Sequence, residues 1–317
     1  MTGHMTDLSA LLLHARDGDT AERRACTRGE LVRLAPGRFV DASTWGRLRA
    51  EDRAALKALA VVPRLSVPVV VSHLSAAALW GMPLLGSGTG PVSVTDQRRA
   101  RTRSGALLVR HSGEVVDAEV RAVAGLRTAS PVRVAVDVAL TCSASQAVAV
   151  ADHGLRLDMF TREQYAECLA DRARTRDRLR ASWVGEFATP LAGSAGESVE
   201  RVLLDALGFP EPVLQHRFTD ARGLIGFTDS AWPDHGLLSE FDGLQKYVDR
   251  DLRGTATVEE VVVREKRRED RLRAVAGVRG MVRSTWRDLH DPPAFGRTFV
   301  HAGLPRVQPP RRSSPRC

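Results

Sequence analysis

The stretch 229–246, DSAWPDHGLLSEFDGLQK, decides how the C-terminal part of this chain is expected to fold. Residues 233–236, Pro-Asp-His-Gly, form a turn signal between two short strand-like segments. In the second segment Glu240 and Asp242 are two residues apart, so strand alternation places both side chains on one face. Asp229 adds a third carboxylate on the neighbouring segment. Such carboxylates repel each other unless a cation or a proton offsets their charge, so the stretch predicts a divalent-metal site.

The elements on both sides of this stretch complete an α/β unit of about a hundred residues, a typical domain size. One helix is predicted to end at Gly208, and a long helix capped by Thr257 is predicted to end at Gly277. The predicted order is helix, three-stranded meander, helix and strand, over residues 197–207, 213–218, 223–231, 236–242, 258–276 and 281–286.

The long helix has a polar interruption in its apolar stripe. The stripe consists of Val258, Val261, Val262, Leu272 and Val275, and midway it passes through Glu265, Lys266 and Glu269. Polar residues at such positions either point into a site or form ion pairs with charged partners. We favour a site, since the alternative is solvent-exposed ion pairs on an arginine-rich helix.

Composition limits the class of protein and its partners. Lys and Arg total 46 against 38 Asp and Glu, and the formal net charge of +8 favours nucleic acid as the acidic partner. The four cysteines are scattered, which argues against a disulfide framework or a zinc knuckle. No run reaches the roughly 18 apolar residues that a membrane span needs. We therefore expect a cytoplasmic protein without a membrane partner.

The front of the chain predicts a winged helix. Helices are expected over 8–16 and 20–28, and a hairpin over 31–40 turns at Pro36-Gly37. Two basic helices followed by a hairpin are typical of a winged helix. The alternative is an ordinary helical cap with solvated arginines. The predicted contacts to nucleic acid are Arg23, Arg24, Arg28, Arg33 and Arg38.

The pattern changes at residue 67, where a middle α/β domain is predicted. Its strands are expected over 67–71, 91–94 and 106–109, and its helices over 74–80 and from Pro131 onward. We interpret His73, Asp137 and the pair Asp152-His153 as structural, because their spacing specifies neither a metal site nor a triad. The predicted domains are 1–66, 67–170, a basic linker 171–195, 196–290 and a disordered basic tail 291–317.

Four C-terminal segments together resemble the very-short-patch-repair-like branch of the PD-(D/E)xK nuclease fold. They are GESVER (196–201), FTDSAWP (227–233), SEFDGLQKY (239–247) and REKRREDRLRAVAG (264–277). The front half, with LVRLAPGRFV and VSHLSAAALWG, resembles AbiEi-type abortive-infection antitoxins, which combine a winged helix with a second α/β domain. The two resemblances cover most of the chain and imply a restriction-endonuclease-like αβββαβ domain at its C-terminal end.

The nuclease resemblance implies a metal site. Asp229 and Glu240 match the two acids that would bind Mg²⁺ or Mn²⁺, and Glu197 matches the acid of the first helix. Helical periodicity instead places Glu200 closer to the inward face of that helix. In the family's mechanism the metal activates a water molecule, and a lysine orients that water and offsets developing charge.

This chain departs from the family pattern at the lysine. Asp242 stands two residues after Glu240, so the motif reads E-x-D, and either Lys246 or Lys266 is the candidate replacement. Two functional hypotheses follow from the sequence. The first is a Mg²⁺-dependent DNA endonuclease guided by the winged helix. The second is a non-catalytic DNA-binding antitoxin or transcriptional regulator of a type IV toxin–antitoxin system, with a cognate toxin as partner.

Overall fold

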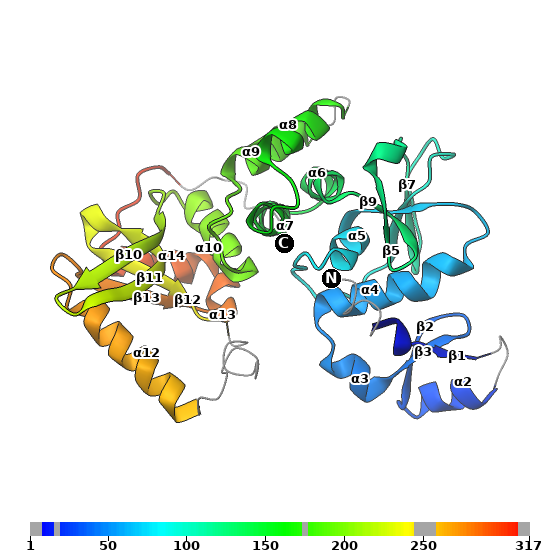
Figure 1. Ribbon diagram of the computed structural model, residues 1–317, viewed down its shortest axis with the longest axis horizontal. Coiled ribbons are helices and arrows are strands. Elements are labelled where there is room, and N and C mark those ends of the chain that lie inside the picture. The colour runs from blue at the N-terminus through cyan, green and yellow to red at the C-terminus, as the bar shows by residue number, and fades with distance from the viewer. Residues whose placement is uncertain (1–7, 16–19, 173–176, 244–257, 310–317) are drawn as a thin grey trace. The chain divides into compact units, whose positions relative to one another are not determined.

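The computed structural model describes residues 8–15, 20–172, 177–243 and 258–309 (Figure 1). Helices and strands are mixed throughout, and the strands of the described residues form three sheets, as the predicted multidomain α/β class requires. The chain divides into two compact units. The first contains Met1–Cys142 and His153–Ala188, and the second contains Ser143–Asp152 and Thr189–Cys317. The predicted boundary at residues 66 and 67 falls inside the first unit and stays a prediction.

The N-terminal sheet is three-stranded, with the order β1-β3-β2. The predicted hairpin is present, and so is the predicted second helix. The helix predicted over 8–16 is wrong at its C-terminal end, because Leu13 pairs with Phe39 as a strand. Local spacing missed this strand because its partner lies in the later hairpin. The elements are β1 (Leu13–His14), α2 (Thr20–Thr27), β2 (Leu31–Ala35), β3 (Arg38–Asp41), α3 (Ala42–Arg47) and α4 (Ala50–Val61).

A six-stranded sheet with the order β6-β7-β5-β4-β9-β8 follows in the first unit. Its strands are β4 (Val70–Val71), β5 (Val92–Thr95), β6 (Arg103–Ser104), β7 (Leu108–His111), β8 (Val120–Val123) and β9 (Leu126–Ala129). Its helices include α5 (His73–Leu79), α6 (Pro131–Thr141), α8 (Arg162–Ala170) and α9 (Arg178–Phe187). Helix α9 lies in the segment that we expected to be a basic linker, and it buries Ala181 and Val184. Helix α7 (Ala144–Arg156) contributes residues to both units.

The second unit has the predicted order αβββαβ around a four-stranded sheet, β10-β11-β12-β13. Strands β10, β11 and β12 form an antiparallel meander, and β13 runs parallel to β12 after the long helix. The elements are α10 (Ala195–Ala206), β10 (Val213–Asp220), β11 (Gly223–Trp232), β12 (Leu237–Phe241), α12 (Val258–Arg273) and β13 (Gly280–Ser284).

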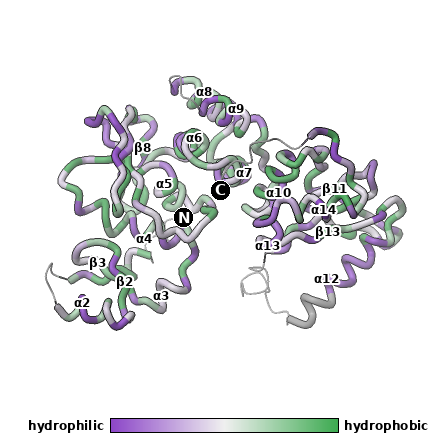
Figure 2. The backbone as a smooth tube through the Cα atoms, turned by 180° about the vertical axis from the view of Figure 1, so that it is seen from behind, coloured by the Kyte–Doolittle hydropathy of each residue, from purple (hydrophilic) through white to green (hydrophobic). Residues whose placement is uncertain are grey.

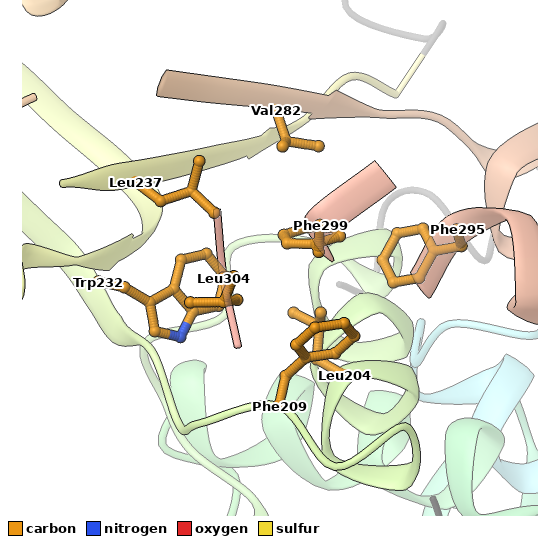
Figure 3. Close-up of a cluster of buried hydrophobic side chains, with 8 residues drawn as sticks. All are labelled: Leu204, Phe209, Trp232, Leu237, Val282, Phe295, Phe299 and Leu304. Atoms are coloured by element: carbon orange, nitrogen blue, oxygen red, sulfur yellow. The ribbon is translucent and has the colours of Figure 1, made fainter. Parts of the chain in front are cut away.

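Two apolar clusters pack on the two faces of this sheet. The first contains Leu237 together with Leu204 from α10 and Phe299 from a later helix (Figure 3). The second contains Leu238 together with Leu272 from α12. Because neighbouring residues of β12 fall in different clusters, α10 covers one face of the sheet and α12 covers the other.

The prediction of a disordered tail beyond residue 291 is wrong for most of that segment, because part of it is a helix that packs into the core. Helix α13 (Trp286–Leu289) is followed by α14 (Pro292–His301), and Asp291 caps α14 by accepting a hydrogen bond from the Ala294 backbone nitrogen. Phe295 and Phe299 of α14 are buried in the first cluster (Figure 3). Their i, i+4 spacing is a helical signal that the proline- and arginine-rich composition hid. Residues 310–317 of the predicted tail lie outside the described residues.

The long helix α12 is mostly hydrophilic along its described turns, as Figure 2 shows. Only Leu272 is fully buried among its side chains from residue 264 onward. Charged residues on its sheet-facing side therefore form ion pairs and hydrogen bonds with residues of the strands. Within the described part of the chain, no helix combines the length and the apolar character needed to cross a membrane.

Candidate functional site

Asp229 and Glu240 face each other at the end of a strand ladder. The pairing of β11 with β12 includes Ser230 opposite Ser239, and continuing that register sets Asp229 opposite Glu240. Here the Asp229 side chain interrupts the ladder, since its Oδ2 accepts a hydrogen bond from the Phe241 backbone nitrogen at 2.8 Å. Asp229 lies two residues from Ala231, and Glu240 lies two residues from Leu238; Ala231 and Leu238 both belong to the second apolar cluster. Because side chains two residues apart share a strand face, both carboxylates lie on the α12 face of the sheet.

Two arginines offset the carboxylates of β12. Arg268 donates to Glu240 Oε1 at 2.6 Å, and Arg283 of β13 lies 3.6 Å from Glu240 Oε2. Arg283 also lies 3.7 Å from an oxygen of Asp242, so one arginine contacts both carboxylates, although Asp242 lies just beyond the end of β12. Both oxygens of Glu240 therefore contact a guanidinium.

Arg268 reaches the site by crossing β11. Its guanidinium donates to the Phe227 carbonyl oxygen at 2.5 Å, and a Cβ at Gly226 would lie 3.1 Å from its Nε atom. Burial lowers the pKa of Arg268, but its hydrogen bond and charge interaction with Glu240 outweigh burial and raise that pKa overall. The charge of Asp229 acts in the same direction. Arg268 is therefore the counter-ion of Glu240, one of the two predicted metal ligands.

The candidate lysines do not provide this cation within the described residues. Lys266 forms an ion pair with Asp270 at 3.0 Å, and both side chains are more than half exposed. Lys246 lies outside the described residues. Sequence analysis missed Arg268, although it lies four residues before Leu272 and thus on the inward stripe of the helix.

The remaining polar residues of the α12 interruption surround the site with ion pairs. Glu269 accepts a hydrogen bond from Arg273 at 2.8 Å and lies 3.2 Å from Arg283. The hydrogen bond from Arg273 lowers the pKa of Glu269. Glu265 lies 3.4 Å from Arg268. Glu265 and Glu269 therefore form ion pairs with the arginines around the site, whereas Lys266 pairs with Asp270 of its own helix.

On the opposite face, Glu200 is the acid of the first helix that points inward. Its side chain is buried, and its Oε1 accepts a hydrogen bond from the Ser239 hydroxyl at 2.6 Å. Its Oε2 has no hydrogen-bond partner among the described residues. Burial raises the pKa of Glu200 to about 7, with the charge of Asp229 adding to that rise. Glu197 is only half-buried and accepts from the Gly193 backbone nitrogen at 2.8 Å.

A close approach of α10 to β12 positions Glu200. A Cβ at Gly196 would lie 1.9 Å from a ring carbon of Phe241, so a side chain there would push the helix away from the strand. The Phe241 ring is held from its other side by an edge contact with Trp286. Glycine at position 196 therefore allows Glu200 to reach Ser239.

The donor set fits Mg²⁺ in type, but it is small. Among the described residues, no three His, Cys, Asp or Glu side chains lie close enough to hold one ion. Asp229 and Glu240 are two carboxylates, and Mg²⁺ is commonly held by one or two carboxylates together with water and substrate phosphate. A metal ion bound through Glu240 would share its oxygens with the guanidinium groups of Arg268 and Arg283.

The predicted nucleic-acid contacts of the first unit differ in their surroundings. Arg23, Arg24 and Arg33 are exposed. Arg28 is exposed as well, but both of its contacts at 2.6 and 2.8 Å are to the Glu30 carboxylate. Arg38 is half-buried and donates to the Gly37 carbonyl oxygen. A contact with nucleic acid is therefore easiest for the first three.

The chain is 30% identical over 130 residues to two proteins of Mycobacterium tuberculosis strains, uncharacterized protein MT2308 and uncharacterized protein Rv2248. The match covers 41% of this chain and 48% of each relative, so the chain spans about half the length of the curated relatives it matches. No protein-family model matches the chain. No solved structure matches it either.

Proposed function

We propose that this protein acts on DNA in the cytoplasm and that its second unit hydrolyses phosphodiesters with Mg²⁺ or Mn²⁺. The observation that carries the proposal is the pair Asp229 and Glu240, held opposite each other where the β11–β12 ladder stops. A hydrogen bond from the Phe241 backbone nitrogen fixes the side chain of Asp229, and the guanidinium of Arg268 contacts Glu240. Paired carboxylates next to a cation that can contact phosphate are suited to phosphodiester chemistry.

Asp229 and Glu240 would hold the metal, which when bound supplies a Lewis acid and an activated water molecule. Asp229 is positioned for this role because its Oδ2 is already fixed by the Phe241 nitrogen, which reduces the side-chain entropy lost on binding. Glu200 supports the site from the other face, where its charge state responds to that of Asp229.

Arg268 would take the place of the family's lysine. With Glu240 holding the metal, the guanidinium of Arg268 beside it would be available to a phosphate oxygen. A guanidinium binds phosphate through two parallel N–H donors and stays charged at all physiological pH values. It can therefore offset charge on the phosphate, but it cannot accept a proton from the attacking water as a neutral lysine can.

The first unit would hold the DNA. Exposed Arg23, Arg24 and Arg33 around the small sheet are suited to phosphate contacts. Substituting one arginine that binds a phosphate should reduce the dependence of log Kd on log salt concentration by about 1.

The test is nicking of supercoiled plasmid by the full chain in Mg²⁺ or Mn²⁺. Asp229→Asn and Glu240→Gln should each reduce nicking by at least about 100-fold, because loss of an outer-shell partner already costs 10–100-fold at metal sites. Arg268→Ala should also reduce nicking, and Arg268→Lys should restore part of it. Lys266→Ala is the matched control and should retain parental nicking. Nicking that persists in both Asp229→Asn and Glu240→Gln would contradict the assigned site.

A second candidate function is a non-catalytic DNA-binding antitoxin or transcriptional regulator with a cognate toxin. The contact between Arg268 and Glu240 favours it, because a guanidinium at 2.6 Å already offsets the charge that would otherwise attract a metal ion. Absence of nicking by the parent protein, together with tight and salt-sensitive binding to one promoter, would support this function instead of hydrolysis.

A further inference from the structure

The first unit contains a cavity of about 750 Å³, a volume typical of small-molecule sites. It lies where the parallel strands β5 and β7 end, since Thr95 and His111 are their last residues and are register partners. Helix α6 provides Arg133 and Asp137 to its wall, and Arg172 follows helix α8. All of these residues belong to one compact unit.

Four polar atoms in the wall of this cavity have no hydrogen-bond partner among the described residues. They are Thr95 Oγ1, His111 Nε2, Asp137 Oδ2 and Arg172 Nε. Thr95 is 2% exposed and Asp137 is 5% exposed, so both side chains are held away from the outer surface of the protein. A buried polar group without a partner costs free energy, and several such groups around one cavity indicate a site shaped for a ligand.

The charges of the wall select the sign of that ligand. Among the described residues, five acidic residues line the cavity, Glu114, Glu119, Asp137, Asp171 and Asp177, and two arginines, Arg133 and Arg172. Acid is therefore in excess in the described wall, although the whole chain has a net charge of +8. An excess of acidic groups attracts cations, so the described wall favours a cationic ligand over phosphate.

Two histidines contribute hydrogen-bonding groups without adding charge. The rings of His73 and His111 stack with centroids 3.5 Å apart, and His73 Nδ1 is 2.9 Å from the Ser72 hydroxyl. Burial lowers the pKa of His73 to about 3 and that of His111 to about 4. Both rings are therefore neutral at pH 7, and the His111 imidazole is able to accept a hydrogen bond at Nε2.

Of the two carboxylates that pair with Arg133, only Asp137 keeps one oxygen for a ligand. Arg133 donates to Asp137 Oδ1 at 2.8 Å and to Glu119 at 2.8 Å, and Glu119 also contacts Arg172. Both oxygens of Glu119 are thus engaged, whereas Asp137 Oδ2 is not. We propose that this cavity binds a small organic cation, one that carries a guanidinium or ammonium group, with its N–H groups donating to Asp137, to the imidazole of His111 and to the hydroxyl of Thr95.

The test uses the full chain in EDTA, so that it is independent of the proposed hydrolysis. Agmatine and spermidine are the cationic probes, and inorganic phosphate and an uncharged alkylurea are the controls, each titrated by calorimetry and by thermal unfolding. The cations should bind and raise the unfolding temperature, and the controls should not. Absence of binding by both cations, or tighter binding of phosphate, would overturn the proposal.

Two variants assign the binding to this cavity. Asp137→Asn should weaken binding of the cations at least about tenfold, since a hydrogen bond to a charged group is lost. Because Asp137 also pairs with Arg133, Thr95→Val serves as a second variant that removes no hydrogen bond from the free protein. It should weaken binding several-fold while leaving the unfolding temperature of the free protein unchanged or higher.

Thr228→Val is the matched control for Thr95→Val. Thr228 is also a buried strand residue whose hydroxyl has no partner among the described residues, but it belongs to β11 in the second unit. It should leave cation binding at the parental level. Parental binding in both Asp137→Asn and Thr95→Val would place the cations elsewhere and overturn the assignment.

Discussion

Asp137 in the first unit and Glu200 in the second are both buried residues with one carboxylate oxygen that lacks a partner among the described residues, but their neighbours differ. Asp137 in the first unit pairs with Arg133 and lies close to His111. Glu200 in the second unit accepts a hydrogen bond from the neutral hydroxyl of Ser239. Burial raises the pKa of both side chains. The difference shows that burial alone does not determine how the stability of a region depends on charge substitutions or on pH. The groups around the buried carboxylate determine it as well.

Arg133→Met should give the largest effect on stability. It leaves Asp137 and part of Glu119 without the counter-ion in a buried setting, and breaking such a pair from one side costs about 3–5 kcal/mol. Denaturant unfolding of the first unit measures this loss. Arg28→Met is the control, because the pair of Arg28 with Glu30 is exposed and its loss should change stability far less. Equal losses in the two variants would contradict the interpretation of the buried network.

Glu200→Gln should instead stabilise the protein above pH 7. The folded protein keeps the Glu200 proton up to about pH 7, whereas the unfolded chain releases it near pH 4.5. The parent therefore loses stability as pH rises between these values, by an amount on the order of 3 kcal/mol. The glutamine variant should lack this loss and be the more stable protein at pH 8.

Unfolding of both proteins at pH 5 and pH 8, in EDTA, checks the expectation for Glu200. Glu197→Gln on the same helix is the control, because Glu197 is only half-buried and its substitution should not stabilise the protein at pH 8. An unchanged pH dependence in Glu200→Gln would show that another group causes the loss.

The histidine pair should give the first unit the reverse pH response, with a smaller effect between pH 6.5 and pH 5. Burial, followed by the charge of Arg133, lowers the pKa of His73 to about 3, whereas the unfolded value is 6.5. Stability from His73 is present above pH 6.5 and is lost as pH falls toward 3, by up to about 1.4 kcal/mol per pH unit. His73→Asn should reduce this slope, and asparagine tolerates the positive φ of 52° at this position. Unfolding midpoints between pH 6.5 and 5 measure the slope, and equal slopes in parent and variant would contradict the role of His73.

Lys266→Ala should give the smallest effect. Lys266 and Asp270 are four residues apart on the helix and form an exposed ion pair, so the loss of this pair should change stability by less than about 0.5 kcal/mol. Arg268→Ala should cost more, because it leaves Glu240 partly buried with a weaker counter-ion. Equal stability of these two variants would mean that Arg268 is no more important to the fold than an exposed residue.

Much of the second unit could be predicted because its signals are local. The helix ending at Gly208, the meander around the Pro233 turn and the long helix all have the predicted order. Strand alternation predicts a common face for Glu240 and Asp242, and Arg283 contacts both carboxylates. Helical spacing had set Glu200 closer to the inward face, although the family resemblance matched Glu197, and the structure buries Glu200.

The sequence by itself thus determined the order of elements and the faces on which their side chains lie, because both depend on repeats within a few residues. Only the tertiary structure decided which cation meets Glu240, since Arg268 reaches it across Gly226 of another strand. It also decided that Phe295 and Phe299 join the core and that His73, His111 and Asp137 share one cavity. These contacts join residues far apart in the chain, where local spacing carries no information about distance.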